Sequence, residues 1–153
     1  MVGSGEAELT LETRKTYYFE DLVLGMEASV SNTVTMADIE TFAGVSGDYN
    51  PVHMDPEFAS KTIFKQVIAH GLLTASYIST VFGMKMPGPG AIYVSQTLNF
   101  KAPVKVGDEV LARVIVVDLM PAKNRARFDC FCTVRGKVVL DGEANMMVPA
   151  RPE

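Results

Sequence analysis

Positive charge is scarce in this sequence, and its scarcity excludes one class of partner. The 153 residues include 14 Lys and Arg against 18 Asp and Glu, which gives a formal charge of -4 and a pI near 5.2. Binding to nucleic acid requires clustered Lys and Arg that neutralise phosphates. We therefore expect no nucleic acid partner, and any anionic ligand must be held by a few local groups.

Cysteine and histidine are rarer still, with two residues of each. Cys130 and Cys132 are two residues apart on a predicted strand, so both side chains point to the same side and are poorly placed to bond to each other. Reduced thiols are typical of a cytoplasmic protein, which is the location we expect. Two histidines without a Cys-x-x-Cys pair provide no metal-ligand spacing, so no metal site is predicted.

Charged residues are absent from one long stretch, Gln66–Met84, which reads QVIAHGLLTASYISTVFGM. Polar side chains interrupt it too often for a membrane span, and we expect no membrane partner. We predict instead a central helix from Gly71 to Met84, apolar nearly all round because other structure encloses it. The acidic N-terminus has no basic segment followed by an apolar run, so we expect no secretory or transit signal and interpret residues 1–16 as a flexible tail.

Beyond this helix the hydrophobic pattern changes to a period of two residues and keeps it to the C-terminus. The predicted strands cover residues 27–34, 92–100, 109–119, 126–135 and 138–148. About five antiparallel strands and one buried helix predict an α+β domain whose sheet packs one face against the helix. The chain is too short for two cores, so residues 17–149 are predicted to form a single domain.

A short helix precedes the central one. Thr35 and Asp38 have the spacing of a capping box, which predicts a helix over residues 36–45 that Gly47 ends.

The stretch GDYNPVH follows that helix and places an acid, Asp48, five residues before a histidine, His53. The pair Asn50-Pro51 between them favours an extended or turn geometry. Asp55-Pro56 then has the pattern of an N-cap and a first helical residue. Residues 48–54 are therefore predicted to be a loop between two helices.

The sequence FAGVSGDYNPVHMDPEFA, Phe42–Ala59, resembles the signature of the MaoC-type (R)-specific enoyl-coenzyme A hydratases. Its core of Asp, Asn-Pro, an aliphatic residue and His is complete, and a small residue stands six places after the His. The resemblance continues through AHGLLTAS and TLNFKAPVKVGDEV, so it covers most of the chain beyond Tyr18. It implies the hot-dog fold, in which a curved antiparallel sheet wraps around one long central helix.

The resemblance also implies an activity: reversible syn hydration of a trans-2-enoyl-CoA to the (R)-3-hydroxyacyl-CoA, with no cofactor besides the coenzyme A of the substrate. Asp48 and His53 match the catalytic pair of the family. Adding water to the double bond requires a base that activates the nucleophile and an acid that protonates the α-carbon. Asp48 as base with His53 as acid is the favoured assignment, and the opposite direction of proton transfer stays open.

Three further positions match residues that bind substrate or support the pair in the family. The backbone N–H of Gly71 matches the oxyanion donor, which agrees with the free N–H groups and the positive dipole end at a helix start. Ser79 matches a serine that hydrogen-bonds the catalytic Asp. Asn50 either braces the loop or contacts the substrate.

Other polar residues of this region have ordinary structural explanations. His70 precedes an uncharged helix and is predicted to be a packed, hydrogen-bonded residue. The hydroxyls of Thr74, Ser76 and Thr80 are predicted to bond to helix carbonyls four residues earlier. The phosphates of coenzyme A require cations, and five lysines are candidates that a solvated surface explains equally well: Lys61, Lys65, Lys85, Lys101 and Lys105.

Domains of this length are similar to half of the double-domain eukaryotic hydratases, which implies a homodimer with one site per subunit, while a higher hot-dog oligomer stays open. Two other functions compete with hydration. A hot-dog acyl-CoA thioesterase would use an acidic residue on the central helix, and Gln66–Met84 contains none. A non-catalytic subunit that binds acyl thioesters would lack the pair, and both Asp48 and His53 are present.

Overall fold

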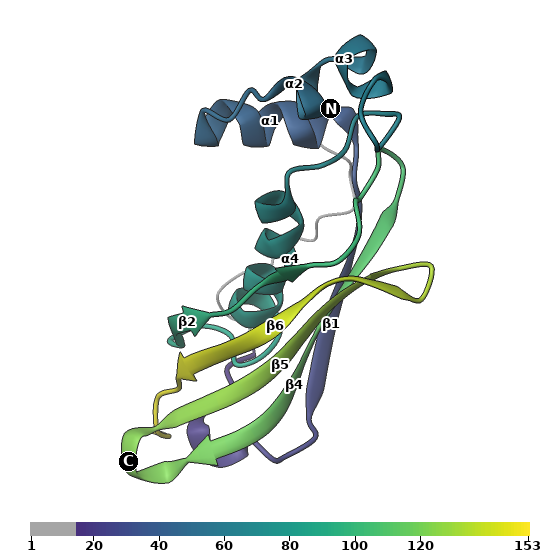
Figure 1. Cartoon of the computed structure of the whole chain (residues 1–153). Helices are drawn as coiled ribbons and strands as arrows, with labels where there is room; N and C mark the ends of the chain where they lie inside the picture. Colours follow the sequence, from purple (N-terminus) through teal and green to yellow (C-terminus); the bar gives the residue numbers. More distant parts are fainter. Residues whose placement is uncertain (1–14) are drawn as a thin grey trace.

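The computed structural model describes residues 15–153, so the tail predicted over 1–16 lies outside the described residues except for its last two. An antiparallel sheet curves around one face of a long helix, and a group of short helices lies beyond one end of that helix (Figure 1). This is the α+β arrangement that the sequence pattern predicts.

The helices are α1 (Met36–Ser46), α2 (Pro51–Met54), α3 (Pro56–Ser60) and α4 (Gly71–Met84), with single 3₁₀ turns at Phe19–Asp21 and Pro121–Lys123. The strands are β1 (Glu27–Thr33), β2 (Ile92–Gln96), β3 (Asn99–Phe100), β4 (Glu109–Met120), β5 (Arg125–Val134) and β6 (Lys137–Met147). They form one sheet in the order β1-β4-β5-β6-β2, and β3 pairs with β6. Strands β1 and β2 are therefore the two edges.

Alternation along the central strands builds the core. Successive residues of β5 alternate between half-buried and buried over its whole length, and β4 does the same over most of its length. Phe128 of β5 and Phe82 of α4 meet edge to face, with ring centroids 5.0 Å apart. Cys130 and Cys132 are free thiols on this buried face, and burial raises the pKa of each to about 12.

The strand predicted over 92–100 is interrupted, which gives six strands instead of five. β2 ends at Gln96 and β3 begins at Asn99. Beside the interruption lies Gly142 of β6, where an added Cβ would collide with the carbonyl oxygen of Thr97. That oxygen takes the space of a side chain, so this close approach of two backbones requires glycine.

Helix α4 has the predicted bounds, but the sheet covers only one of its faces. Six of its residues are buried: Leu73, Thr74, Tyr77, Ile78, Val81 and Phe82. The open face carries the exposed ones: Gly71, Leu72, Ser76, Ser79, Thr80, Gly83 and Met84. The expectation of a helix enclosed all round is therefore wrong for a single chain. No helix within residues 15–153 is both long and apolar enough to cross a membrane.

The short helices begin and end at residues that cap them. Thr35 and Asp38 form the predicted capping box at the start of α1, and Gly47 ends it with a φ of 80°. Asp55 accepts hydrogen bonds from the N–H groups of Glu57 and Phe58, so it is the predicted N-cap of α3. The loop predicted over 48–54 is wrong in its second half, because Pro51 fixes a backbone angle suited to the single helical turn of α2.

Candidate active site

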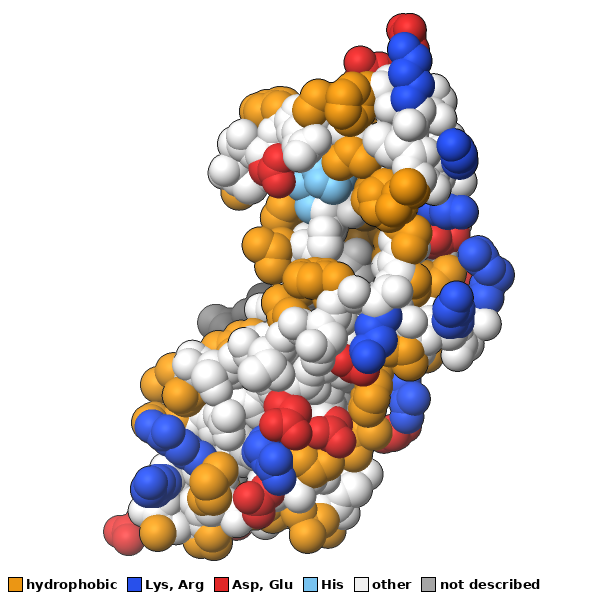
Figure 2. Space-filling view, viewed as in Figure 1, with side chains coloured by type: hydrophobic (Ala, Val, Ile, Leu, Met, Phe, Trp, Pro, Cys, Tyr) orange, Lys and Arg blue, Asp and Glu red, His pale blue; other side chains and the backbone are white. Residues whose placement is uncertain are grey.

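A cavity of about 630 Å³ lies between the short helices and the N-terminal end of α4. Figure 2 shows it as a hollow whose upper wall carries the histidines, with hydrophobic side chains around them. Aromatic and aliphatic side chains form most of the wall, among them Phe42, Phe64, Ile68, Phe100 and Leu140. A mostly apolar hollow with a few convergent polar groups is typical of a site for a small molecule.

Asp48 lines this cavity immediately after α1, and hydrogen bonds fix its backbone on both sides. Its N–H donates to Ser46 Oγ at 3.1 Å, and its carbonyl oxygen accepts from His70 Nε2 at 2.9 Å. One carboxylate oxygen, Oδ1, accepts from the N–H of Asn50 at 3.1 Å. The other carboxylate oxygen makes no hydrogen bond to the described residues. The exposed carboxylate therefore keeps an oxygen available to a ligand.

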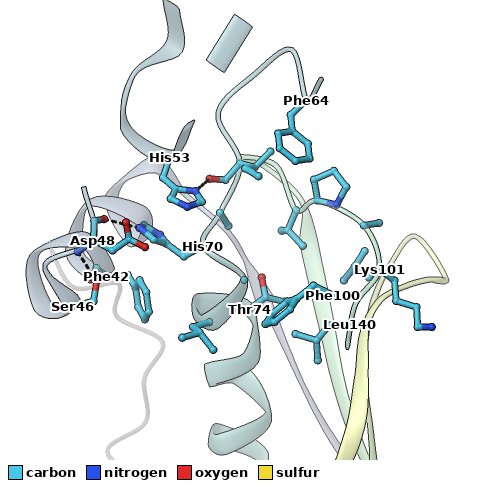
Figure 3. Close-up of a pocket in the computed structure, with 18 residues that line it drawn as sticks. Phe42, Ser46, Asp48, His53, Phe64, His70, Thr74, Phe100, Lys101 and Leu140 are labelled. Carbon is cyan, nitrogen blue, oxygen red and sulfur yellow. Dashed lines mark hydrogen bonds between the residues drawn. The ribbon is translucent and has the colours of Figure 1, made fainter. Parts of the chain in front are cut away.

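His53 lies on the single turn of α2 and is half-buried. Its Nδ1 is 2.8 Å from the carbonyl oxygen of Ile68 (Figure 3). A carbonyl oxygen only accepts, so Nδ1 carries the proton of this hydrogen bond. Nε2 is then the nitrogen left for chemistry in the cavity.

The fold brings the predicted pair together. Polar side-chain atoms of Asp48, His53 and His70 all lie within 4.8 Å of one another. One water molecule can bridge groups at such a separation, because each of its hydrogen bonds spans about 2.8 Å. The arrangement can therefore hold a water between a carboxylate and an imidazole.

The same three side chains are close enough to hold a metal ion, but the ring geometry opposes it. The His53 and His70 rings are stacked, with centroids 4.0 Å apart and planes inclined by 28°. A tetrahedral ion requires nitrogen lone pairs that converge on one point. Lone pairs lie in the ring planes, and the planes of two stacked rings stay apart near the rings, so an ion close to a nitrogen of each ring would lie out of at least one plane. The arrangement therefore suits a hydrogen-bonded water better than a metal ion.

Gly71 begins α4 at the cavity wall. Its backbone N–H has no carbonyl partner in the described residues, as expected at the first position of a helix. The Phe100 ring covers its Cα, so an added Cβ would lie 2.6 Å from Phe100 Cε1. Glycine is thus required where the aromatic ring approaches, and the N–H is available to a ligand oxygen.

Two other predicted site residues lie outside the cavity. Asn50 caps α2, since its Oδ1 accepts from the N–H of Val52 at 3.2 Å, and this geometry supports the bracing role. Ser79 lies eight residues after Gly71, about 12 Å further along α4 at 1.5 Å per residue. It lines a separate hollow of about 170 Å³ beside Tyr93 of β2. The predicted hydrogen bond from Ser79 to Asp48 is therefore not made within one chain.

The structure adds cavity residues that sequence reasoning did not assign. Thr74 lines the cavity, and its hydroxyl makes no bond back to the helix, contrary to the prediction. Thr80 does bond to the carbonyl four residues earlier, whereas Ser76 bonds to the carbonyl three residues earlier.

Lys101 is the one candidate lysine in the cavity wall, and it pairs with Asp141 at 3.8 Å. Placement of Lys101 depends on the pairing of β3 with β6, which no local sequence pattern discloses.

Comparisons with known proteins identify the relatives of this chain. The family model described as MaoC like domain matches residues 24–136. The (R)-specific enoyl-CoA hydratase of Rhodospirillum rubrum is 53% identical over 135 residues, covering 88% of this chain and 94% of that protein. The 3-hydroxybutyryl-CoA dehydratase of Methylorubrum extorquens is 48% identical over 139 residues, covering 91% of this chain and 88% of that protein.

Solved structures of two hydratases have the same fold as this chain. The unliganded R-hydratase of Pseudomonas aeruginosa superposes with a TM-score of 0.85 at 41% identity, covering 89% of this chain and 88% of that one. The (R)-hydratase from Aeromonas caviae, described as involved in PHA biosynthesis, superposes with a TM-score of 0.83 at 40% identity, covering 85% of this chain and 99% of that one.

Proposed function

We propose, since the chain belongs to the family of MaoC-like domains, that it catalyses the reversible hydration of trans-2-enoyl-CoA to (R)-3-hydroxyacyl-CoA. The observation that carries the proposal is the placement of Asp48 and His53 within 4.8 Å of each other in an apolar cavity beside the start of α4. The close relatives named above include hydratases and a dehydratase of acyl-CoA thioesters.

Asp48 and His53 act on one water molecule. Its oxygen forms a bond to C3 of the enoyl group while the π bond breaks, and a proton is delivered to C2. In the favoured direction His53 starts with a proton on both ring nitrogens; Asp48 takes a proton from the water while His53 delivers its Nε2 proton to C2. The proton taken by Asp48 then returns to His53 Nε2, which restores the pair. Both groups lie on the same side of the cavity, so hydroxyl and hydrogen reach one face of the alkene and the addition is syn.

The N–H of Gly71 stabilises the negative charge that develops on the thioester oxygen. The start of α4 contributes its positive dipole end at the same point. A donor that is already in place, and that lies in a largely apolar cavity, stabilises this charge more than water would. The segment around α2 therefore supplies the acid and the base, and α4 supplies the donor that stabilises the oxyanion.

The two competing functions have less support from the geometry. A thioesterase that used an acid on the central helix would need one in α4, which has none. Among residues 15–153, Asp48 is the one acidic residue in the cavity wall. A subunit that only binds acyl thioesters would not require a carboxylate and an imidazole that are placed near each other, each held by hydrogen bonds to its own neighbours.

The functional unit we propose is a homodimer. Leu72 of α4 is 59% exposed, and Ile92 of the edge strand β2 is 56% exposed, so the open face of α4 and the edge strand form a surface on which large apolar side chains stand among small polar ones. Ser79 lies beside β2 on this surface, so its predicted contact with a catalytic Asp is proposed to form between two protomers. Light scattering should give a mass twice the 16.6 kDa of one chain.

The hydration assay tests the activity. Purified protein is added to crotonyl-CoA, the absorbance of the enoyl thioester is followed, and the product is analysed on a chiral column. We expect the absorbance to fall and the (R) alcohol to form. Release of free thiol would transfer the assignment to a thioesterase, and binding without turnover would indicate a non-catalytic subunit. The same assay over a series of acyl chain lengths defines the substrate.

A further inference from the structure

His70 has no role in the mechanism above, yet it contacts both members of the pair. It stands immediately before Gly71 and is 3% exposed. We infer that His70 is a positioning residue, which holds Asp48 and His53 in their reactive arrangement while taking no part in proton transfer. The inference rests on the proposed function, because it assigns His70 a role in that same reaction.

The first contact is with Asp48. His70 Nε2 lies 2.9 Å from the backbone carbonyl oxygen of Asp48, which only accepts, so Nε2–H is the donor. Asp48 itself lies in an exposed segment between α1 and α2. The hydrogen bond ties this segment to the buried residue that precedes α4, so the position of the Asp48 carboxylate is fixed relative to the helix that carries the oxyanion donor.

The second contact is with His53. Its Nδ1 hydrogen bond to Ile68 fixes one point of the ring but leaves rotation about that point. The His70 ring stacks on it at 4.0 Å and blocks this rotation. Phe42 lies against the His70 ring with centroids 4.8 Å apart and holds it in place (Figure 3). His70 therefore sets the plane in which His53 Nε2 points into the cavity.

A third observation separates this role from ordinary packing. His70 Nδ1 is buried and has no hydrogen-bond partner among the described residues. Buried polar atoms are normally paired, because an unpaired one destabilises the fold. A ring selected for packing alone would carry no such atom, as in phenylalanine. The imidazole is explained by its Nε2–H and its stacked face, both of which act on the pair.

Two variants divide the role into its parts. His70→Phe keeps a ring that stacks on His53 but removes the donor to Asp48. His70→Gln keeps an amide donor at the reach of Nε2 but removes the ring. We expect each to lower kcat about tenfold to a hundredfold, since small displacements of reacting groups have effects of this size, with KM within about twofold. Leu73→Ala is the matched control. Leu73 is the third residue of α4, is buried like His70, and does not line the cavity.

The control should lower the melting temperature and leave kcat unchanged. A double-mutant cycle adds the decisive readout. His70→Phe removes the donor to Asp48 and should have almost no further effect in an Asp48→Asn background, whereas His70→Gln removes the ring stacked on His53 and should have almost none in a His53→Ala background. The inference is overturned if both His70 variants keep kcat within about twofold of the wild type. It is also overturned if the effects in these two pairs add fully.

The failure of the proposed function gives a different result. An inactive wild type would remove the hydratase assignment, and the positions of the rings are then compared by NMR without any substrate. His70→Gln removes the ring stacked on His53 and should shift the Nε2 resonance of His53 relative to the wild type and to Leu73→Ala. Unchanged His53 resonances would overturn the positioning role, whatever the reaction is.

Discussion

The segment around Asp48 and the strands β4 and β5 are ordered by different interactions. Alternate residues of β4 and β5 are fully buried, and apolar contact with α4 holds them. Residues 44–51 are all exposed and are held by a few hydrogen bonds, in which Ser46 and Asn50 accept and His70 donates. Apolar burial supplies most of the stability of a fold, whereas single hydrogen bonds contribute about 1 kcal/mol each.

This difference separates stability from chemistry. The sheet and α4 provide a rigid support, and the segment that carries the acid and the imidazole is fixed to it at a few points. Substitutions in the segment should change the reaction with little effect on unfolding. Substitutions in the sheet should do the opposite.

The largest effect is expected at the pair itself. Asp48→Asn and His53→Ala should each lower the hydration rate at least about a hundredfold, the usual contribution of a positioned acid or base. Asp48 is exposed and His53 half-buried, so the unfolding free energy should stay within about 1 kcal/mol of the wild type. Steady-state kinetics measures the loss of rate, and denaturant unfolding measures the free energy of unfolding. A variant that keeps most of its activity would remove that residue from the mechanism.

The opposite result is expected at Phe128, which is fully buried between β5 and α4. Phe128→Ala leaves a cavity in the core and should lower the free energy of unfolding by about 3–5 kcal/mol. Molecules that remain folded should hydrate substrate at nearly the wild-type rate. Activity is therefore measured well below the midpoint of unfolding and corrected for the folded fraction. A large loss in kcat of the folded protein would contradict the separation, because it would show that the core also controls the reaction.

An intermediate effect is expected at Thr35, which caps the helix leading to the catalytic segment. Its hydroxyl accepts from the N–H of Asp38 at 3.1 Å. Thr35→Ala should destabilise the protein by about 1 kcal/mol, while Thr35→Ser keeps the oxygen and should be close to the wild type. Thermal unfolding of the two variants measures the difference. Equal melting temperatures would show that the cap contributes little.

The smallest effect is expected from thiol reagents. Burial raises the pKa of Cys130 and Cys132 from 9.0 to about 12, so at pH 8 the reactive thiolate fraction is far below that of an ordinary cysteine. Native protein treated with iodoacetamide should therefore retain its mass, and unfolded protein should take up two labels. Rapid labelling of the native state would mean that the sheet opens more readily than its burial indicates.

Sequence patterns predicted the features that depend on neighbouring residues. The cap at Thr35, the glycine end of α1 and the bounds of α4 follow from spacings of a few positions. Asp48 and His53 were assigned from the resemblance to the family signature, and the structure places their polar atoms within 4.8 Å of each other. The features that depend on distant parts of the chain were missed. The break after β2 depends on the close approach of Thr97 to Gly142, which are far apart in sequence.

His70 and Ser79 show the same limit at the site. His70 was expected to be a packed residue, and it is packed, but its packing partner is His53. Only the folded chain shows that contact. Ser79 was expected near Asp48 and lies instead on the open face of α4. A pattern within one chain cannot place a contact that we propose to form between two protomers.

The central claim is that Asp48 and His53 act on one water at one face of the alkene. Hydration of crotonyl-CoA in D₂O, followed by NMR of the isolated product, tests it most directly. The account predicts the (R) alcohol with a single deuterium at C2, on the same face as the hydroxyl at C3. Deuterium on the opposite face, or an equal mixture of the two, would contradict the account.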